Sequence, residues 1–120
     1  TVLAGGEILA KPANFSDATR IWQHLKEPDH CVLTGIALWH AGVIAQRVVT
    51  TKVDFTGIPE EEQRAYWDSG EPQDKAGAYA IQGRAALYIR GIEGSYSNVV
   101  GLPLAETAAL LRQANYPLWL

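Results

Sequence analysis

A dense loop sequence between Gly70 and Gly83 constrains the fold of this chain more than any other stretch. Its residues, GEPQDKAGAYAIQG, include three glycines, one proline, two acids, one lysine and two glutamines. A hairpin tip needs only one or two turn residues, so this density predicts a backbone held close to another surface. Lys75 offers a point charge suited to phosphate, and Gln82 offers a donor and an acceptor. A long ordered loop with a salt-bridged lysine and a surface amide would explain the same residues.

The composition bounds the class of protein. The chain has 120 residues, 48% apolar and 19% charged, which is enough to bury one core and predicts one domain over residues 1–120. A formal net charge of -3 gives no basic signature, so we expect no nucleic-acid partner. No apolar run approaches membrane-spanning length, so we expect no membrane partner. The single cysteine, Cys31, excludes an internal disulfide and favours a cytoplasmic location.

Hydrophobic periodicity predicts helices and strands in mixed order along the chain. Strands are predicted at residues 1–4, 7–9, 31–39, 43–55 and 85–92, and helices at 14–27, at 59–69 and after Pro103. The imperfect alternation of residues 31–39 predicts a strand covered on both faces. The apolar tail, residues 116–120, is expected to pack on the body. These elements predict an α+β or α/β chain with a mixed sheet.

No metal-ligating set is predicted from this sequence. His24, His30 and His40 share no ligand spacing with one another or with Cys31, so we interpret them as structural or surface residues. The acids at positions 60–62 open a predicted helix, where the positive end of the helix dipole favours them. Capping is therefore the preferred interpretation of that acidic cluster.

Three blocks of sequence follow one another in a fixed order. They are G-E-I-L-x-K-P at residues 6–12, G-E-P-x-D-K-A-G-A-Y-x-I-Q-G at 70–83, and G-S-Y-x-x-V-x-G-L-P-L at 94–104. Together they resemble the Maf family of nucleoside triphosphate pyrophosphatases, and the similarity runs from Thr1 to about Leu111. The resemblance implies a Maf-like, inosine triphosphatase-like fold, with an elongated mixed sheet, flanking helices and a cleft between two lobes.

Two features of that family do not occur in this chain. The family begins with a Ser-x-Ser-Pro-Arg-Arg loop that holds the triphosphate, and it carries an Ala-Asp-Thr segment just ahead of the strand matched here by residues 2–4. The aspartate of that segment is the family's general base, and the usual spacing places it just before Thr1. The chain therefore resembles the C-terminal two-thirds of a family member, N-terminally incomplete and with no catalytic residue of its own.

The resemblance implies attack of water on the α-phosphorus of a nucleoside triphosphate, which gives the monophosphate and pyrophosphate. It also implies a divalent cation as cofactor, Mg²⁺ or another ion such as Mn²⁺. Lys11 and Lys75 would contact the phosphates. Gln82 would select the base, because a pyrimidine N–H beside a carbonyl can pair with one amide. The Y-x-I-Q-G pattern resembles the subgroup that acts on dTTP and UTP, and modified pyrimidine nucleotides are further substrates that this allows.

Several alternatives stay open at this point. Glu71 and Asp74 would either aid the metal indirectly or brace the loop. The whole protein would be either an enzyme or a non-enzymatic nucleotide-binding regulator of septum formation, and the chain itself would be an inactive fragment of the enzyme. The resemblance also allows a homodimer, in which the partner is a second copy of the protein.

Overall fold

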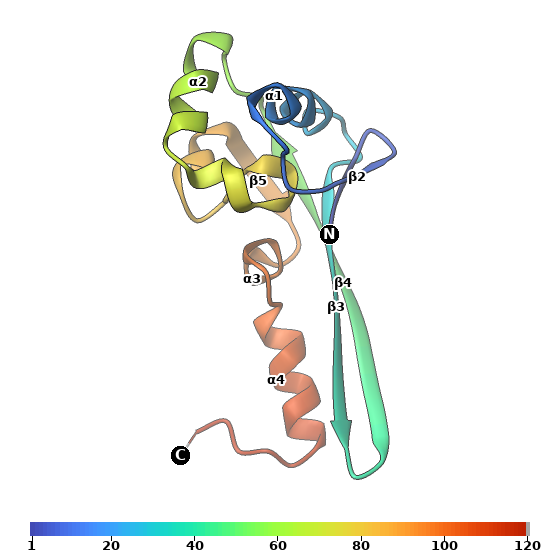
Figure 1. The fold of residues 1–120 in the computed structure, drawn as a ribbon. Coiled ribbons are helices and arrows are strands. Elements are labelled where there is room, and N and C mark those ends of the chain that lie inside the picture. The colour runs from blue at the N-terminus through green and yellow to red at the C-terminus, as the bar shows by residue number, and fades with distance from the viewer. Residues whose placement is uncertain (120) are drawn as a thin grey trace.

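The computed structural model describes residues 1–119 and shows a head joined to a long stalk (Figure 1). Within these residues five strands form one sheet: β1 (Val2–Ala4), β2 (Glu7–Leu9), β3 (Cys31–His40), β4 (Val43–Phe55) and β5 (Ile89–Glu93). Their order is β2-β1-β3-β4-β5, and every pairing between them is antiparallel. The molecule is elongated and measures 53 × 31 × 25 Å along its principal axes.

The helices divide between the two parts. Helices α1 (Phe15–His24) and α2 (Glu60–Asp68) lie in the head, together with the short 3₁₀ helices Glu71–Asp74, Ala76–Ala78 and Arg84–Tyr88. Helix α3 (Tyr96–Val100) lies at the junction, and α4 (Leu104–Gln113) runs down beside the stalk (Figure 1). Among residues 1–119, no helix has both the length and the apolar character needed to cross a membrane.

Local sequence signals account for several of these elements. The side chain of Asn14 caps α1 by accepting a hydrogen bond from the Asp17 amide at 2.8 Å. Ser95 caps α3 in the same way, by accepting from the Asn98 amide at 3.1 Å. The stalk is the hairpin of β3 and β4, which pair from Cys31↔Lys52 to His40↔Val43.

The core of the head is rich in aromatic side chains. Trp22, Phe55, Tyr66, Tyr79 and Tyr88 are buried there, with ring centroids of neighbouring pairs about 6 Å apart, near the usual separation of packed rings. The indole Nε1 of Trp22 donates to the carbonyl of Ala78 at 2.8 Å, so α1 is tied to the loop beyond α2.

Two predictions about the sheet need correction. The chain is α+β, and the α/β alternative with a mixed sheet is wrong for the described residues, because every pair of neighbouring strands in the sheet is antiparallel. The first long strand is not covered on both faces. Trp39 is 69% exposed, and the part of β3 around it pairs with β4 alone among the strands, since β1 pairs only with Cys31 and Val32.

Two further predictions fail near the C-terminal end. Residues 85–92 were expected to form one strand, but the 3₁₀ helix Arg84–Tyr88 occupies its first part and β5 begins at Ile89. The tail does not pack on the body over the described residues, since Trp119 is 91% exposed and Tyr116 is also exposed. Leu120, which belonged to that expectation, lies outside the described residues.

Candidate functional site

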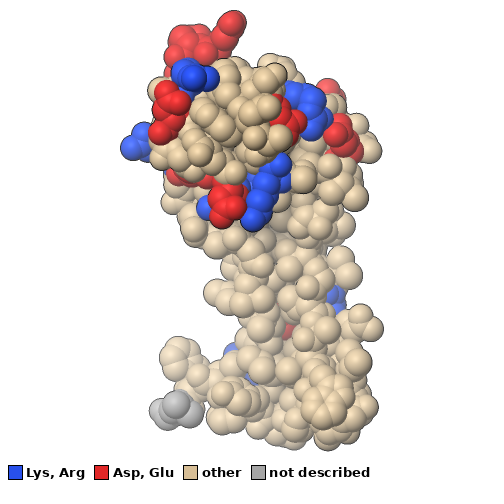
Figure 2. All heavy atoms as spheres, viewed as in Figure 1, with Lys and Arg blue, Asp and Glu red and all other residues tan. Residues whose placement is uncertain are grey.

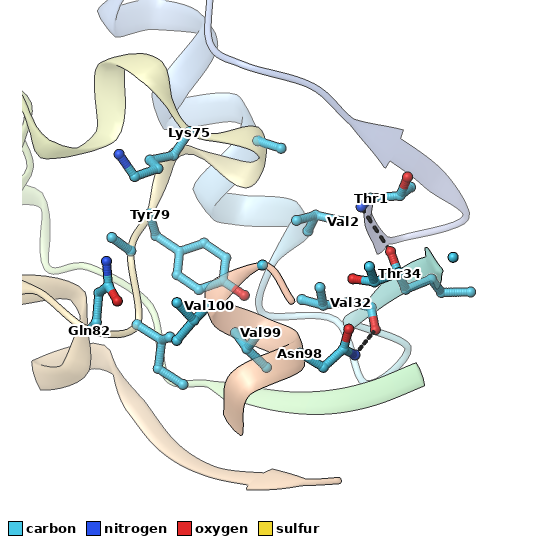
Figure 3. Close-up of a pocket in the computed structure, with 16 residues that line it drawn as sticks. Thr1, Val2, Val32, Thr34, Lys75, Tyr79, Gln82, Asn98, Val99 and Val100 are labelled. Atoms are coloured by element: carbon cyan, nitrogen blue, oxygen red, sulfur yellow. Dashed lines mark hydrogen bonds between the residues drawn. The ribbon is translucent and has the colours of Figure 1, made fainter. Parts of the chain in front are cut away.

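A cavity of about 340 Å³ lies where the head meets the stalk (Figure 3). The ends of β1 and β3, the loop of residues 75–82 and helix α3 form its walls. Lys75 and Gln82 both line it from the loop, across from Thr34 and Asn98 on the opposite side (Figure 3). The structure therefore brings two of the three predicted substrate-binding residues into one cavity.

The loop lies tightly against the first strand. Gly77 has φ +78, and a Cβ added there would lie 3.1 Å from Cγ1 of Val2. Its amide donates to the carbonyl of Ala10 at 3.1 Å, which ties the loop to the end of the first hairpin. Only glycine combines this backbone conformation with such a close approach at low cost. The close approach predicted from the glycine content of the loop is confirmed.

Glu71 braces the loop from inside. Its Oε1 accepts from the Arg84 amide at 2.9 Å, and its Oε2 accepts from the Ala85 amide at 3.2 Å and from the Tyr66 hydroxyl at 2.5 Å. Burial and the nearby Glu71 carboxylate raise the pKa of Tyr66. A Cβ at Gly83 would lie 2.0 Å from Glu71 Oε1, so this position needs a residue without a side chain. Glu71 was expected either to aid a metal indirectly or to brace the loop, and these contacts support the bracing role.

Lys11 occupies a different place from Lys75. Its Nζ lies 2.9 Å from Oδ1 of Asp74, both side chains are exposed, and Lys11 is not among the residues that line the cavity. The hydrogen bond from Lys11 holds the pKa of the Asp74 carboxyl below its usual range. Among residues 1–119, Lys75 makes no ion pair. The loop salt bridge considered for Lys75 is thus made by Lys11 and Asp74, and Lys75 keeps its charge available to the cavity.

Tyr79 forms a wall of the cavity and is held from behind by a buried histidine. The Nε2 of His30 lies 3.1 Å from the Tyr79 hydroxyl, and its Nδ1 lies 3.1 Å from the carbonyl of Leu25. A carbonyl only accepts hydrogen bonds, so Nδ1 carries the proton and Nε2 accepts from the tyrosine. Burial lowers the pKa of His30 to about 4, which keeps the ring neutral. His30 is a structural residue, as predicted for the histidines.

Asn98 is a cavity residue that the sequence analysis did not single out. Its Nδ2 lies within 3.2 Å of three acceptors, the carbonyls of Val32 and Val49 and the hydroxyl of Thr51. Its Oδ1 is buried and has no hydrogen-bond partner within residues 1–119. These contacts fasten α3 to β3 and β4, and so fix the wall that α3 contributes to the cavity. The only sequence signal was its place inside the third block, behind the capping Ser95.

The chemistry of the lining does not suit a metal ion. Of the residues that line the cavity, Lys75 is the only charged one, and none is an acid, a histidine or a cysteine. Among residues 1–119, no group of three or more such side chains could hold a metal. Divalent cations such as Mg²⁺ take oxygen ligands, mainly carboxylates, waters and substrate phosphates. The cavity lining of the described residues therefore suits a phosphate group and a ligand with a polar edge. It does not have the side chains needed to coordinate a divalent ion.

The family model described as Maf-like protein matches residues 1–114. The chain belongs to this family. It is 47% identical over 119 residues to a dTTP/UTP pyrophosphatase of Hahella chejuensis, an alignment that covers 99% of this chain and 59% of that protein. It is 49% identical over 121 residues to a dTTP/UTP pyrophosphatase of Anaeromyxobacter dehalogenans, covering 98% of this chain and 62% of that protein.

A third relative, a dTTP/UTP pyrophosphatase of Colwellia psychrerythraea, is 51% identical over 117 residues, which cover 97% of this chain and 55% of that protein. Across these relatives the chain spans 55–62% of their length. The predicted share of two-thirds is therefore too large.

The second and third Maf-like blocks line the cavity, and the first block contacts the loop that forms one of its walls. The first block reaches the loop through the Ala10 carbonyl and the Lys11–Asp74 pair. The second block is the loop itself, with Lys75 and Gln82. The third block supplies α3, whose Asn98 lies at the cavity. Segments far apart in sequence thus line one cavity.

Proposed function

We propose that the protein to which this chain belongs hydrolyses the pyrimidine nucleoside triphosphates dTTP and UTP to the monophosphate and pyrophosphate. One observation carries the proposal: the unpaired cation of Lys75 and the amide of Gln82 line the same cavity. It is supported by relatives at 47–51% identity that are named dTTP/UTP pyrophosphatases. Because the chain spans only part of their length, the activity is proposed for the whole protein.

Each polar residue takes a role that its chemistry and place allow. Lys75 contacts the phosphates, since an ammonium is a compact point charge suited to them. Gln82 pairs with the pyrimidine edge through its carbonyl and its amide hydrogens. Lys11 is held by Asp74 outside the cavity lining, and a bound triphosphate at the loop would compete with Asp74 for it. Lys11 therefore contributes less than Lys75.

We place the general base outside the described residues, just ahead of Thr1. Thr1 lines the cavity, and its carbonyl accepts from the Leu33 amide at 2.8 Å, as in a strand beside β3. A residue preceding Thr1 would continue along β3 and reach the same cavity. In this proposal the ligands of Mg²⁺ or Mn²⁺ come from the substrate phosphates and from the part of the whole protein that corresponds to the rest of its relatives' length.

The test is pyrophosphate release from dTTP and UTP, with Mg²⁺ or Mn²⁺, by the full-length protein and by the 120-residue chain in parallel. We expect turnover by the full-length protein and none by the chain, because positioning without a base leaves the barrier largely intact. Turnover by the chain at the full-length rate would show that the base lies within it. Nucleotide binding by the full-length protein without hydrolysis would support the regulator of septum formation instead.

Two variants of the full-length protein then test the roles within the cavity. Lys75→Ala should lower the turnover rate, because it removes about 2–4 kcal/mol of transition-state stabilisation. Lys52→Ala is the control and should leave the turnover rate unchanged, because Lys52 is an exposed lysine of β4 that does not line the cavity. Gln82→Glu loses the amide donor, so it should change the preference among nucleotides more than the rate. A fall by one common factor for all nucleotides would assign Gln82 a structural or phosphate-side role.

A further inference from the structure

A second, more open groove adjoins the cavity. It has a volume of about 480 Å³ and shares Ile81 and Gln82 with the cavity lining. The other lining residues are mostly apolar and include Ile89 and Ile92 of β5 and the ring of Tyr96. These walls carry no charged side chain to attract a phosphate, and they suit a flat, weakly polar ring. The two hollows therefore differ in chemistry, and Gln82 belongs to both.

Tyr96 is a half-exposed aromatic residue on a rigid support. It is 51% exposed and is the first residue of α3. The amide of the preceding Ser95 donates to Thr51 Oγ1 at 3.0 Å, and Asn98 ties the same helix to β3 and β4. A Cβ at Gly94 would lie 2.8 Å from Thr51 Oγ1, so the chain leading into Tyr96 lies directly against β4. The backbone that carries the ring is fixed before any ligand arrives.

We propose that Tyr96 is the stacking platform for the nucleobase of the substrate. The base lies in the groove with one face on the Tyr96 ring, its edge pairs with Gln82, and the phosphates extend into the cavity toward Lys75. This inference rests on the proposed function and adds a residue to its site. It follows from the two lining residues, Ile81 and Gln82, that the hollows share and from their different chemistry, since aromatic side chains stack on the π-face of bases.

The experiment measures binding to the full-length protein by titration calorimetry with Mg²⁺, using two probes. One probe is thymidine 5′-(α,β-imido)triphosphate, and the other is inorganic tripolyphosphate, which has no base. Tyr96→Ala and Tyr96→Leu should each weaken the nucleotide analogue about 10-fold and leave tripolyphosphate unchanged. Tyr96→Phe keeps the ring and should bind both probes like the wild type. Tyr116→Ala removes another exposed tyrosine, outside both hollows, and serves as the matched control.

Each outcome either supports base stacking by Tyr96 or contradicts it. An unchanged affinity of Tyr96→Leu for the nucleotide analogue would overturn the inference while leaving the proposed function intact. An equal loss for both probes would assign Tyr96 a structural role and overturn it as well. If the wild-type protein binds tripolyphosphate but gains nothing from the base, both Tyr96 and Gln82 lose their assigned roles. If the wild type binds neither probe, the proposed function fails and this inference fails with it.

Discussion

The head and the stalk of this protein differ in how far their parts of the β-sheet are buried. In the head and at its junction with the stalk, polar groups such as His30 and Asn98 are fully buried and held by hydrogen bonds. In the stalk, large apolar side chains such as Trp39 and Val48 are exposed. Figure 2 shows the same division by charge, because lysines, arginines and acids gather on the head and few appear on the stalk in that view.

Strand β4 shows that the difference does not come from local sequence. It runs through both parts, and its head end buries Thr51, Val53 and Phe55 while its stalk end exposes Val43 and Ile44. The residue types are similar at the two ends, and all favour strands. What differs is the number of neighbouring elements, since the head end has β3, β5 and the aromatic core around it. We infer that most of the stability comes from the head, and that the stalk depends on backbone pairing, its turn and the packing of α4 along one side.

The largest predicted difference is between a tryptophan of the head and a tryptophan of the stalk. Trp22→Ala should lower the free energy of unfolding by about 3–5 kcal/mol, because the side chain is 1% exposed and donates to Ala78. Trp39→Ala in the stalk should change it by less than about 0.5 kcal/mol, because the side chain is 69% exposed. Urea unfolding followed by circular dichroism measures both. Equal losses would show that the stalk contributes to stability as much as the head.

A second prediction concerns acid stability and comes from His30. The folded protein keeps this ring neutral down to a pKa of about 4, whereas the unfolded chain takes up a proton near pH 6.5. The unfolded state therefore binds more protons below pH 6.5, and stability is lost as the pH falls from 6.5 toward 4. The loss should reach about 3 kcal/mol.

The measurement is the free energy of unfolding at several pH values between 7 and about 4, within the window set by the His30 pKa. His30→Gln offers neutral partners to Leu25 and Tyr79, so it should remove most of this pH dependence even if it lowers stability at pH 7. His40→Gln, at the exposed end of β3, is the matched control and should keep the wild-type slope. A slope unchanged in His30→Gln would contradict the assignment.

Sequence reasoning located the elements whose signals are local. The first hairpin, the capped helix α1 and the long hairpin of β3 and β4 follow from caps, turn residues and periodicity within a few positions. The 3₁₀ helix Arg84–Tyr88 was missed because its start is held by Glu71, whose carboxylate accepts from an amide 13 positions away. The exposure of β3 was missed for a related reason, since alternation does not reveal what will cover a strand.

The same distinction between local signals and long-range contacts applies to the candidate site. The composition of the loop and the family resemblance were enough to single out Lys75 and Gln82, which share the cavity. The pairing of Lys11 with Asp74 joins residues 63 positions apart, and the bond from Asn98 to Val32 spans 66 positions. No local pattern carries information about such contacts. The placement of Lys11 outside the cavity lining and the part played by Asn98 therefore required the structure.

The last prediction concerns the tip of the stalk, where the turn between β3 and β4 contributes to stability. Ala41 and Gly42 both have positive φ, 51° and 79°, which is the requirement of a type I′ hairpin turn. Alanine pays for this conformation with steric strain, whereas asparagine tolerates it and forms the favoured Asn-Gly pair. Ala41→Asn should raise the free energy of unfolding by about 0.5–1 kcal/mol. Gly42→Ala should lower it through strain alone, since an added Cβ would meet no atom within 4 Å. Urea unfolding of both variants measures the pair, and a fall in stability for Ala41→Asn would show that the stalk is not held by its turn.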